Sequence, residues 1–322
     1  MSVPFVELLG RQVGMLGYDE TCSLCPRGCK VNRAKGEVGY CGVTSTFKIA
    51  RAALHMWEEP CISGKTGSGA IFFSGCNMGC VFCQNHEISM GRWGKEISSE
   101  RFMEICYELK DKGANNINLV TPDHYITELY VVLDRLKKQG FDLPIVYNSS
   151  AYVKVEALRR MEGLVDIYLP DFKYDSGEAA QSYSRAKDYP VTAKAAISEM
   201  VRQQPDCRFD TAGMLKHGVI VRHLLLPGQL YAARKIVKYL HETYGDHIYI
   251  SLMNQYTPIE RYGQTSASDW GDTDEKLTQK VPADSYENLV KYARSIGVEQ
   301  GFIQEGETAK ESFIPAFDLE GV

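Results

Sequence analysis

Three closely spaced cysteines carry the strongest chemical signal in the sequence. Cys76, Cys80 and Cys83 form a C-x3-C-x2-C pattern directly after the apolar run Ala70–Phe73, with Phe82 just before the last cysteine. Three thiolates can bind three irons of a four-iron cluster and leave the fourth iron without a protein ligand, whereas a ferredoxin-type set supplies four thiolates. An open iron allows a small molecule to bind the cluster directly. The alternative interpretation, three cysteines of a zinc site or of a buried core, is disfavoured by the spacing and the preceding strand.

A second group of cysteines lies nearer the N-terminus. Cys22, Cys25, Cys29 and Cys41 place four soft ligands in a short, glycine-containing stretch. This pattern favours a metal knuckle, and structural zinc and an auxiliary iron–sulfur cluster fit it equally well. Unmetallated core cysteines are the remaining interpretation. Cys61 lies between the two groups, and we expect it to be packed rather than to act as a fifth ligand or a redox thiol.

Composition narrows the class of protein. The 322 residues include 24% charged and 44% hydrophobic residues, as in an ordinary globular protein. The net charge of −5 argues against a nucleic-acid partner, which usually needs a basic face. No apolar run is long enough to span a bilayer, and the first residues lack the features of a signal peptide. We therefore expect a cytoplasmic protein without a membrane partner, whose ten cysteines are reduced.

Strand-like and helix-like segments alternate after about residue 69. Expected strands are 70–74, 116–121, 144–149, 165–171, 218–226, 247–253 and 301–304. One expected helix begins near Ser98 or Ser99. Further helices are expected at 129–136, 155–161, 177–204, 232–244 and 286–296. This order predicts parallel β–α units in an α/β fold, namely a partial (β/α)6-type barrel. A doubly wound sheet is the alternative, but no Gly-x-Gly-x-x-Gly follows the first strand.

The division along the chain follows from the same patterns. We expect a cysteine-rich segment at 1–68, the barrel at 69–305 and a tail at 306–322. Residues 258–284 are polar and are expected to form a long loop over one face.

Polar side chains stand at the ends of the expected strands. Because the carboxyl ends of barrel strands meet at one face, we expect these side chains to lie close together. The set is Thr121, Asn148, Ser149, Asp171, Lys173 and Arg222. Lys173 and Arg222 suit a carboxylate, and Asn148 and Ser149 suit hydroxyl groups.

The chain resembles the radical S-adenosylmethionine (radical SAM) superfamily. The resemblance rests on the stretch from Phe73 to Asn85 and runs from Cys22 to about Phe317. It is most similar to a branch labelled pyruvate formate-lyase activating enzyme, through Asp171-Phe172-Lys173 and the stretches 57–64, 166–174, 222–228 and 249–256.

The resemblance implies a 4Fe-4S cluster on Cys76, Cys80 and Cys83 whose open iron binds the amino and carboxylate groups of SAM. Lys173 or Arg222 would meet the SAM carboxylate. Asn148 and Ser149 would meet its ribose or amino-acid part, and backbone near Phe82 its adenine. Thr121 lies where many such enzymes have a Gly-Gly-Glu turn for the SAM ammonium, a turn that this chain lacks.

The implied activity is reductive cleavage of SAM to methionine and a 5′-deoxyadenosyl radical, which abstracts hydrogen from a substrate. The electron donor would be a flavodoxin or ferredoxin. One hypothesis is a glycyl-radical activating enzyme acting on a partner enzyme's glycine. Its counter-argument is that Gly64–Gly69 replaces the Gly-Pro-Gly-x-Arg-type stretch of such activases. The alternatives are modification of a peptide or small molecule, and a non-catalytic iron–sulfur or zinc scaffold.

Overall fold

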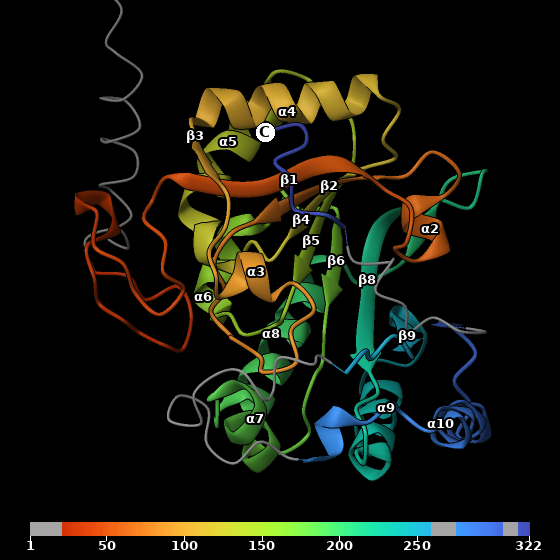
Figure 1. The fold of residues 1–322 in the computed structure, drawn as a ribbon. Coiled ribbons are helices and arrows are strands. Elements are labelled where there is room, and N and C mark those ends of the chain that lie inside the picture. Colours follow the sequence, from red (N-terminus) through yellow and green to blue (C-terminus); the bar gives the residue numbers. More distant parts are fainter. Residues whose placement is uncertain (1–20, 259–274, 305–314) are drawn as a thin grey trace, which may run out of the picture.

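The centre of the molecule is a ten-stranded, mostly parallel sheet (Figure 1). This computed structural model describes residues 21–258, 275–304 and 315–322. The strands that run parallel to their neighbours are β2 (Ser68–Phe73), β4 (Ile117–Val120), β5 (Ile145–Ser149), β6 (Ile167–Pro170), β8 (Leu215–Leu224), β9 (Tyr249–Met253) and β10 (Gly301–Ile303). Their order is β2-β4-β5-β6-β8-β9-β10, and β10 ends the path without pairing back to the other edge. The prediction of an α/β fold with a partial barrel is confirmed.

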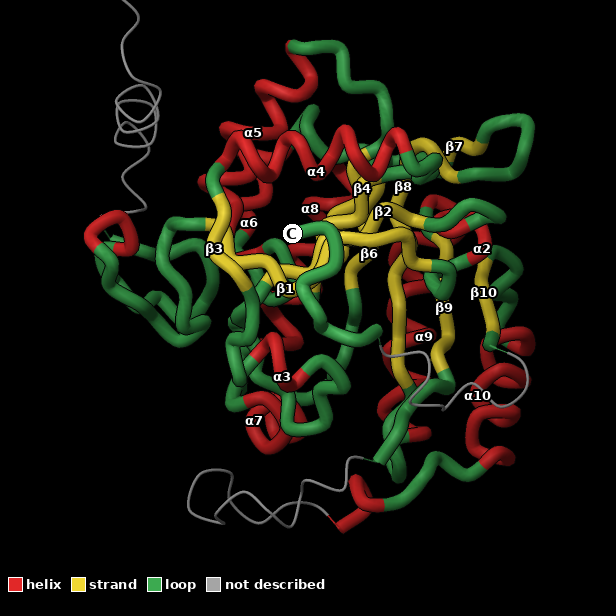
Figure 2. The backbone as a smooth tube through the Cα atoms, turned by 45° about the horizontal axis from the view of Figure 1, so that its top comes forward, coloured by secondary structure: helices red, strands yellow, loops and turns green. Residues whose placement is uncertain are grey.

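Helices cover the outer face of this sheet (Figure 2). They are α4 (Ser99–Asp111), α5 (Ile126–Lys138), α6 (Val155–Leu158) with the 3-10 turn η3 (Arg159–Met161), α7 (Gly177–Ser184), α8 (Tyr189–Gln203), α9 (Leu230–Tyr244) and α10 (Ala283–Ser295). Ser98 caps α4, because its hydroxyl accepts a hydrogen bond from the amide of Arg101 at 3.1 Å. The helical insert expected at 177–204 is two helices, since the chain turns at Arg185 (φ 50°) and Pro190 stands in the first turn of α8.

Three strands, β1, β3 and β7, were not predicted. β1 (Phe47–His55) pairs antiparallel with β2, and β3 (Lys95–Ile97) pairs antiparallel with β1. A short hairpin strand, β7 (Arg208–Phe209), pairs with β8. The described C-terminal residues lie beside β1, where Ala52 donates its amide to the carbonyl of Glu320 at 2.8 Å. Part of the segment 1–68 therefore belongs to the same sheet as the barrel.

The short helix α2 (Pro60–Ser63) fills the amino-terminal end of the barrel. Cys61 and Ile62 are buried there against inward-facing side chains of the strands: Val146, Ile167, Leu169, Leu215 and Ile220. This agrees with the expectation that Cys61 is a packed residue, and burial raises the pKa of its thiol to about 12. The opposite, carboxyl end of the barrel is left for a cavity.

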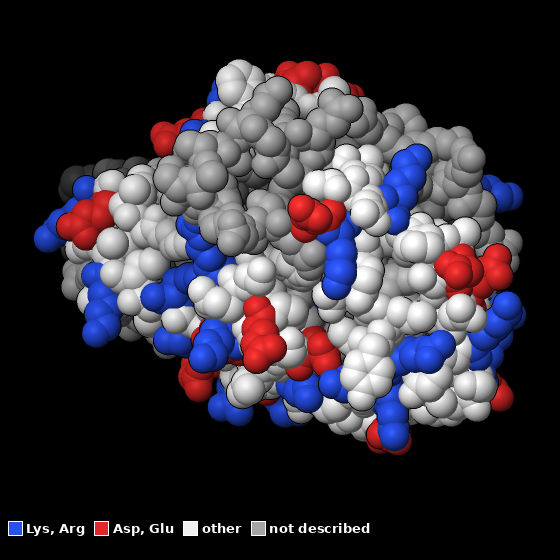
Figure 3. Space-filling model, turned by 60° about the horizontal axis from the view of Figure 1, so that its bottom comes forward, with Lys and Arg blue, Asp and Glu red and all other residues white. Residues whose placement is uncertain are grey.

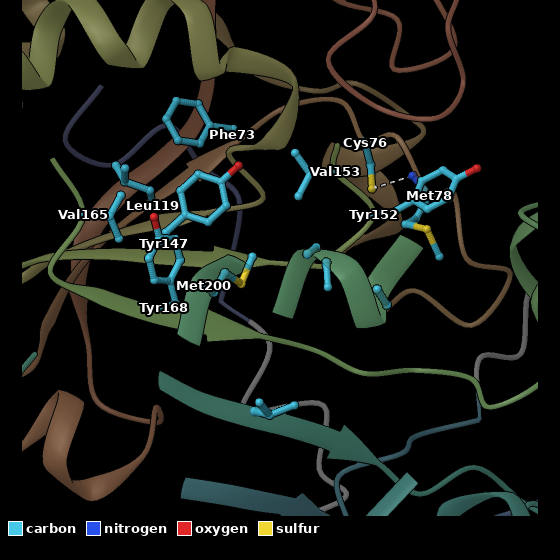
Figure 4. Close-up of a cluster of buried hydrophobic side chains, with 14 of the residues drawn as sticks. Phe73, Cys76, Met78, Leu119, Tyr147, Tyr152, Val153, Val165, Tyr168 and Met200 are labelled. Carbon is cyan, nitrogen blue, oxygen red and sulfur yellow. Dashed lines mark hydrogen bonds between the residues drawn. The ribbon is translucent and has the colours of Figure 1, made fainter. Parts of the chain in front are cut away.

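The outer core is continuous and aromatic-rich. Figure 4 shows Tyr147 and Tyr168 side by side in it, with ring centroids 5.9 Å apart, and Cys76 at its edge. Figure 3 shows Lys and Arg side chains interspersed with Asp and Glu over one face of the molecule. Among the described residues, no helix combines the length and apolar character needed to cross a membrane. The loop expected at 258–284 lies largely outside the described residues; its last part contains the 3-10 turn η6 (Glu275–Thr278).

Candidate active site

The loop after β2 places three cysteines beside one large cavity. Cys76, Cys80 and Cys83 line this cavity of about 430 Å³, which lies at the carboxyl ends of the strands. Each sulfur accepts a hydrogen bond: Cys76 from the amide of Met78 at 3.3 Å (Figure 4), Cys80 from Ser184 Oγ at 3.0 Å and Cys83 from Ser89 Oγ at 3.5 Å. Hydrogen bonds to thiolate sulfur are one of the ways in which proteins set the potential of an iron–sulfur cluster.

The donor set suits an iron–sulfur cluster. Burial, together with the neighbouring Cys80 and Cys83, raises the pKa of Cys76 to about 12. Such thiols ionise when they bind a metal, because the coordinated cation replaces the proton. Within the described ranges, no group of three or more His, Cys, Asp or Glu residues converges on a site for a single metal ion. A four-iron cluster instead takes one thiolate on each ligated iron.

The residues predicted at the strand ends, together with Phe82 of the cysteine loop, line the same cavity as the three cysteines. They are Phe82, Thr121, Asn148, Ser149, Asp171, Lys173 and Arg222. The fold therefore brings the whole predicted set together, as expected for the carboxyl ends of parallel strands. Their contacts with SAM stay predictions, and the hydrogen bonds they make within the protein differ from one residue to the next.

Arg222 is held by protein acceptors on all sides of its guanidinium group. Its Nε donates to Asp171 Oδ1 at 2.9 Å, its Nη1 to Glu58 Oε2 at 2.9 Å and its Nη2 to Asn148 Oδ1 at 2.6 Å. These bonds use three of the five N–H donors of the guanidinium group, one on each nitrogen. Lys173 Nζ donates one hydrogen bond to Asp171 Oδ2 at 2.6 Å. Two of the three N–H donors of its ammonium group remain. Both side chains keep two N–H donors, and Lys173 is the one that interacts electrostatically with Cys80 and Cys83 of the cysteine loop.

Charge balance keeps this network ionised. Burial raises the pKa of Asp171, but the charges of Arg222 and Lys173 outweigh burial and hold that pKa below its usual value. Burial lowers the pKa of Lys173, and the negative charges of Asp171 and the Cys80 thiolate reverse the shift and leave it raised. Lys173 therefore links the carboxylates of the barrel electrostatically to the cysteine loop.

The hydrogen bonds of Ser149 and the backbone conformation of Thr121 could not be inferred from the sequence. The Ser149 hydroxyl donates to Asp123 Oδ1 at 2.6 Å and accepts the amide of Ala151 at 2.9 Å, so it is engaged within the protein. Asp123 is fully buried, and burial raises the pKa of its carboxyl group despite these bonds. Thr121 adopts φ +62°, a left-handed conformation that costs a residue with a branched side chain free energy and is common at functional sites.

Phe82 lies in an aromatic pocket at the rim of the cavity. Its ring makes edge contacts with Tyr174, Tyr183 and Tyr256 at centroid distances of 6.4, 6.4 and 6.2 Å. The neighbouring amide of Val81 donates to the carbonyl of Tyr183 at 2.9 Å. These contacts fix the backbone of the cysteine loop, which is the part expected near adenine.

The N-terminal cysteines share a small cavity of their own. Cys22, Cys25, Cys29 and Cys41 line one small cavity, and burial raises the pKa of Cys25 to about 12. The amide of Tyr40 donates to the Cys29 sulfur at 3.3 Å, as backbone amides do around metal-bound thiolates.

The N-terminal segment packs directly on the cysteine loop. Arg27 donates from Nε to the carbonyl of Asn77 at 2.9 Å and from Nη2 to that of Met78 at 3.2 Å. Gly75 and Gly79 have positive φ values, and a Cβ atom at Gly75 would lie 2.6 Å from the carbonyl oxygen of Cys41. The two cysteine groups therefore occupy adjoining parts of the structure.

Sequence reasoning missed two carboxylates of the cavity, Glu58 and Glu59. Glu58 Oε1 accepts hydrogen bonds from Asn118 Nδ2 at 3.0 Å and Asn148 Nδ2 at 3.3 Å. Both residues belong to the stretch 57–64, which entered the sequence analysis only as part of the resemblance to the activating-enzyme branch. Two adjacent acidic residues before Pro60 gave no hint that they enter the barrel.

The chain is similar to several known proteins. The chain is 29% identical over 280 residues to the uncharacterized protein MJ0674 of Methanocaldococcus jannaschii, covering 85% of this chain and 75% of that protein. Similar solved structures include Streptococcus suis SuiB bound to its precursor peptide SuiA, with a TM-score of 0.48, 11% identity and coverage of 72% of this chain and 46% of SuiB. The match thus spans about half of SuiB. Methylornithine synthase (PylB) matches with a TM-score of 0.41, 14% identity and coverage of 99% and 86%.

A sequence model of the Radical SAM superfamily matches residues 70–239, from β2 through most of α9. The match covers more than half of the chain and includes the three-cysteine loop. This family carries a 4Fe-4S cluster and uses SAM. The chain belongs to the radical SAM superfamily.

Proposed function

We propose that the protein cleaves SAM reductively and that the resulting 5′-deoxyadenosyl radical abstracts a hydrogen atom from a substrate in the barrel cavity. One observation carries the proposal: the three thiols of the C-x3-C-x2-C loop and the polar strand-end side chains line the same cavity. When bound, the cluster supplies the electron that breaks the sulfonium bond.

The residues of this chain have distinct tasks in the proposal. Cys76, Cys80 and Cys83 hold the cluster, and Ser184 orients the Cys80 sulfur. Lys173 donates to the SAM carboxylate, while Asp171 keeps Lys173 charged and in place.

The test is anaerobic reconstitution with iron and sulfide, reduction in the presence of SAM and detection of 5′-deoxyadenosine. We expect product from the wild type and none from Cys80→Ala, because a thiolate ligand of the cluster is lost. Cys207→Ala is the matched control, since Cys207 lies outside the cavity and is only half-buried. Retained cleavage in a cluster-replete Cys80→Ala protein would sink the assignment. No product from wild type that holds a reduced four-iron cluster would favour the scaffold hypothesis.

Two substrate classes remain within this function. Glycyl-radical activation is supported by the resemblance at Asp171-Phe172-Lys173. Modification of a peptide or small molecule is supported by the carboxylates that line the cavity, which suit a polar ligand rather than a bare glycine backbone. An electron paramagnetic resonance search for a glycyl radical, in a glycyl-radical enzyme from the same genomic neighbourhood, separates the two. A doublet appearing only with active protein and SAM supports activation.

We also infer a second metal centre on Cys22, Cys25, Cys29 and Cys41, either zinc or an auxiliary iron–sulfur cluster. Support comes from the four thiols that surround one small cavity beside the cysteine loop. Metal and sulfide analysis of Cys76→Ala/Cys80→Ala/Cys83→Ala protein distinguishes the two metals. Retained iron and sulfide indicate a cluster, retained zinc indicates a zinc site, and loss of all metal contradicts the inference. A flavodoxin or ferredoxin is the proposed reductant.

A further inference from the structure

Glu59 is a buried carboxylate whose bonding is incomplete. It precedes α2, lines the large cavity and is 8% exposed. Its Oε2 has no hydrogen-bond partner among the described residues. Burial of a charged or polar atom without a partner is costly, so buried carboxylates in proteins are normally paired. Glu59 also lines the cavity, so a ligand bound there can complete its bonding after a small rotation of the side chain.

The cations of the cavity are already committed to other carboxylates. Arg222 binds Asp171 and Glu58, and Lys173 binds Asp171. His55 also lines the cavity, but burial and the charges of Arg51 and Arg222 lower its pKa to about 4, so it is neutral at pH 7. Among the described lining residues, the carboxylates Glu58, Glu59 and Asp171 therefore outnumber the cations Arg222 and Lys173.

The position of Glu59 relative to the cluster loop follows from its neighbours. Lys173 interacts with Asp171 and with the Cys80 and Cys83 thiolates, and thus marks the cluster end of the charged network. The charged groups that act most strongly on Glu59 are Arg222 and Glu58, at the other end of that network. SAM binds the cluster and so occupies the Lys173 end.

We propose that Glu59 binds a positively charged nitrogen group, an ammonium or a guanidinium, of the substrate. The inference rests on the proposed function and names the class of substrate for it. A cationic N–H donor supplies both the missing hydrogen bond and the missing positive charge, which a neutral hydroxyl or amide does not. Burial raises the pKa of Glu59, and a bound cation would favour the ionised carboxylate.

The experiment measures calorimetric binding of matched probe pairs to the reconstituted, SAM-loaded protein without reductant. The pairs are arginine with citrulline and lysine with norleucine, which differ in the positive charge of the side chain. We expect at least one cationic member to bind more than about tenfold tighter than its neutral match, since a charge-assisted hydrogen bond contributes at least that much. Glu59→Gln should abolish this preference. Glu104→Gln, an exposed change on α4, should keep it.

Several results would overturn the proposal. One is the absence of a preference in both pairs, which includes the absence of any binding. Another is a preference that survives in a folded Glu59→Gln protein. A third is weaker SAM binding by Glu59→Gln without any probe preference, because the carboxylate would then serve SAM. The binding measurement needs no turnover. Its outcome is therefore independent of the 5′-deoxyadenosine assay, which tests the proposed function.

Discussion

Replacing Glu58 by Ala should destabilise the protein by about 3 kcal/mol, because it removes one partner of a buried ion pair. Glu58 Oε2 accepts from Arg222 Nη1 at 2.9 Å, and the two side chains are only 9% and 13% exposed. Breaking such a pair typically costs about 3–5 kcal/mol, since the remaining charge is left buried and uncompensated. Asp171 still holds the other side of Arg222, which places the expected loss at the lower end of that range.

Asn118 adds to the effect of the substitution. Its Nδ2 donates to Glu58 Oε1 and is fully buried in the barrel, so the variant leaves this donor unsatisfied too. Glu58→Gln keeps the volume of the side chain but replaces one carboxylate oxygen by an amide donor facing Arg222. We therefore expect it to lose most of the same stability.

The assay is urea unfolding of the cluster-free protein, followed by circular dichroism, with the midpoint and slope compared between variants. Glu104→Ala is the control, because its ion pair with Arg101 on α4 is exposed and worth less than about 1 kcal/mol. A Glu58→Ala/Arg222→Met double variant should lose less than the sum of the single variants, since their effects share one contact. A loss below about 1 kcal/mol for Glu58→Ala would refute the view that this pair anchors the barrel interior.

Two further predictions concern the cluster potential and the response to acid. Ser184→Ala should lower the reduction potential of the cluster, because the hydroxyl of Ser184 stabilises added negative charge at the Cys80 sulfur. The expected change is about 20–60 mV, which corresponds to a hydrogen bond of about 0.5–1.5 kcal/mol in a one-electron couple. An unchanged potential in a redox titration followed by electron paramagnetic resonance would contradict this. Burial, with the charges of Arg51 and Arg222, lowers the pKa of His55 from 6.5 to about 4, so the unfolded chain takes up this proton first as the pH falls. The free energy of unfolding should therefore drop as the pH falls from 6.5 to 4. In urea titrations His55→Gln should lose up to about 1.4 kcal/mol less of this free energy per pH unit than the wild type, and equal pH dependence of the two proteins would contradict the prediction.

The cluster loop and the strand-end groups could be predicted because their signals are local. The spacing of Cys76, Cys80 and Cys83 lies within one loop, and polar residues directly after apolar runs mark the carboxyl ends of strands. Parallel pairing then brings those ends to one face whatever the order of the strands. The direction of each side chain and its partners were beyond such reasoning.

Glu58 and Glu59 could not be found in this way because their position depends on pairing between distant segments. β1 runs antiparallel to β2 and is mostly buried along its length, so its sequence has no regular alternation of apolar and polar residues. The chain then turns into α2, which fills the amino-terminal end of the barrel. Only this return into the barrel brings the two carboxylates to Arg222 and Ser251.

Asn148 and Ser149 illustrate the same limit at the scale of one residue. Successive side chains of a strand point to opposite faces, so only one of two neighbours can point into the barrel. Parallel strands are buried on both faces, and the apolar residues of β5 therefore give no sign of which face is which. The structure decides: Val146 packs inside the barrel and Asn148 binds Arg222 there, while Ser149 follows Tyr147 in donating to Asp123. Of the two groups expected at a ribose, Asn148 is the one that the strand directs into the barrel, and the Ser149 hydroxyl instead holds the buried Asp123 in place.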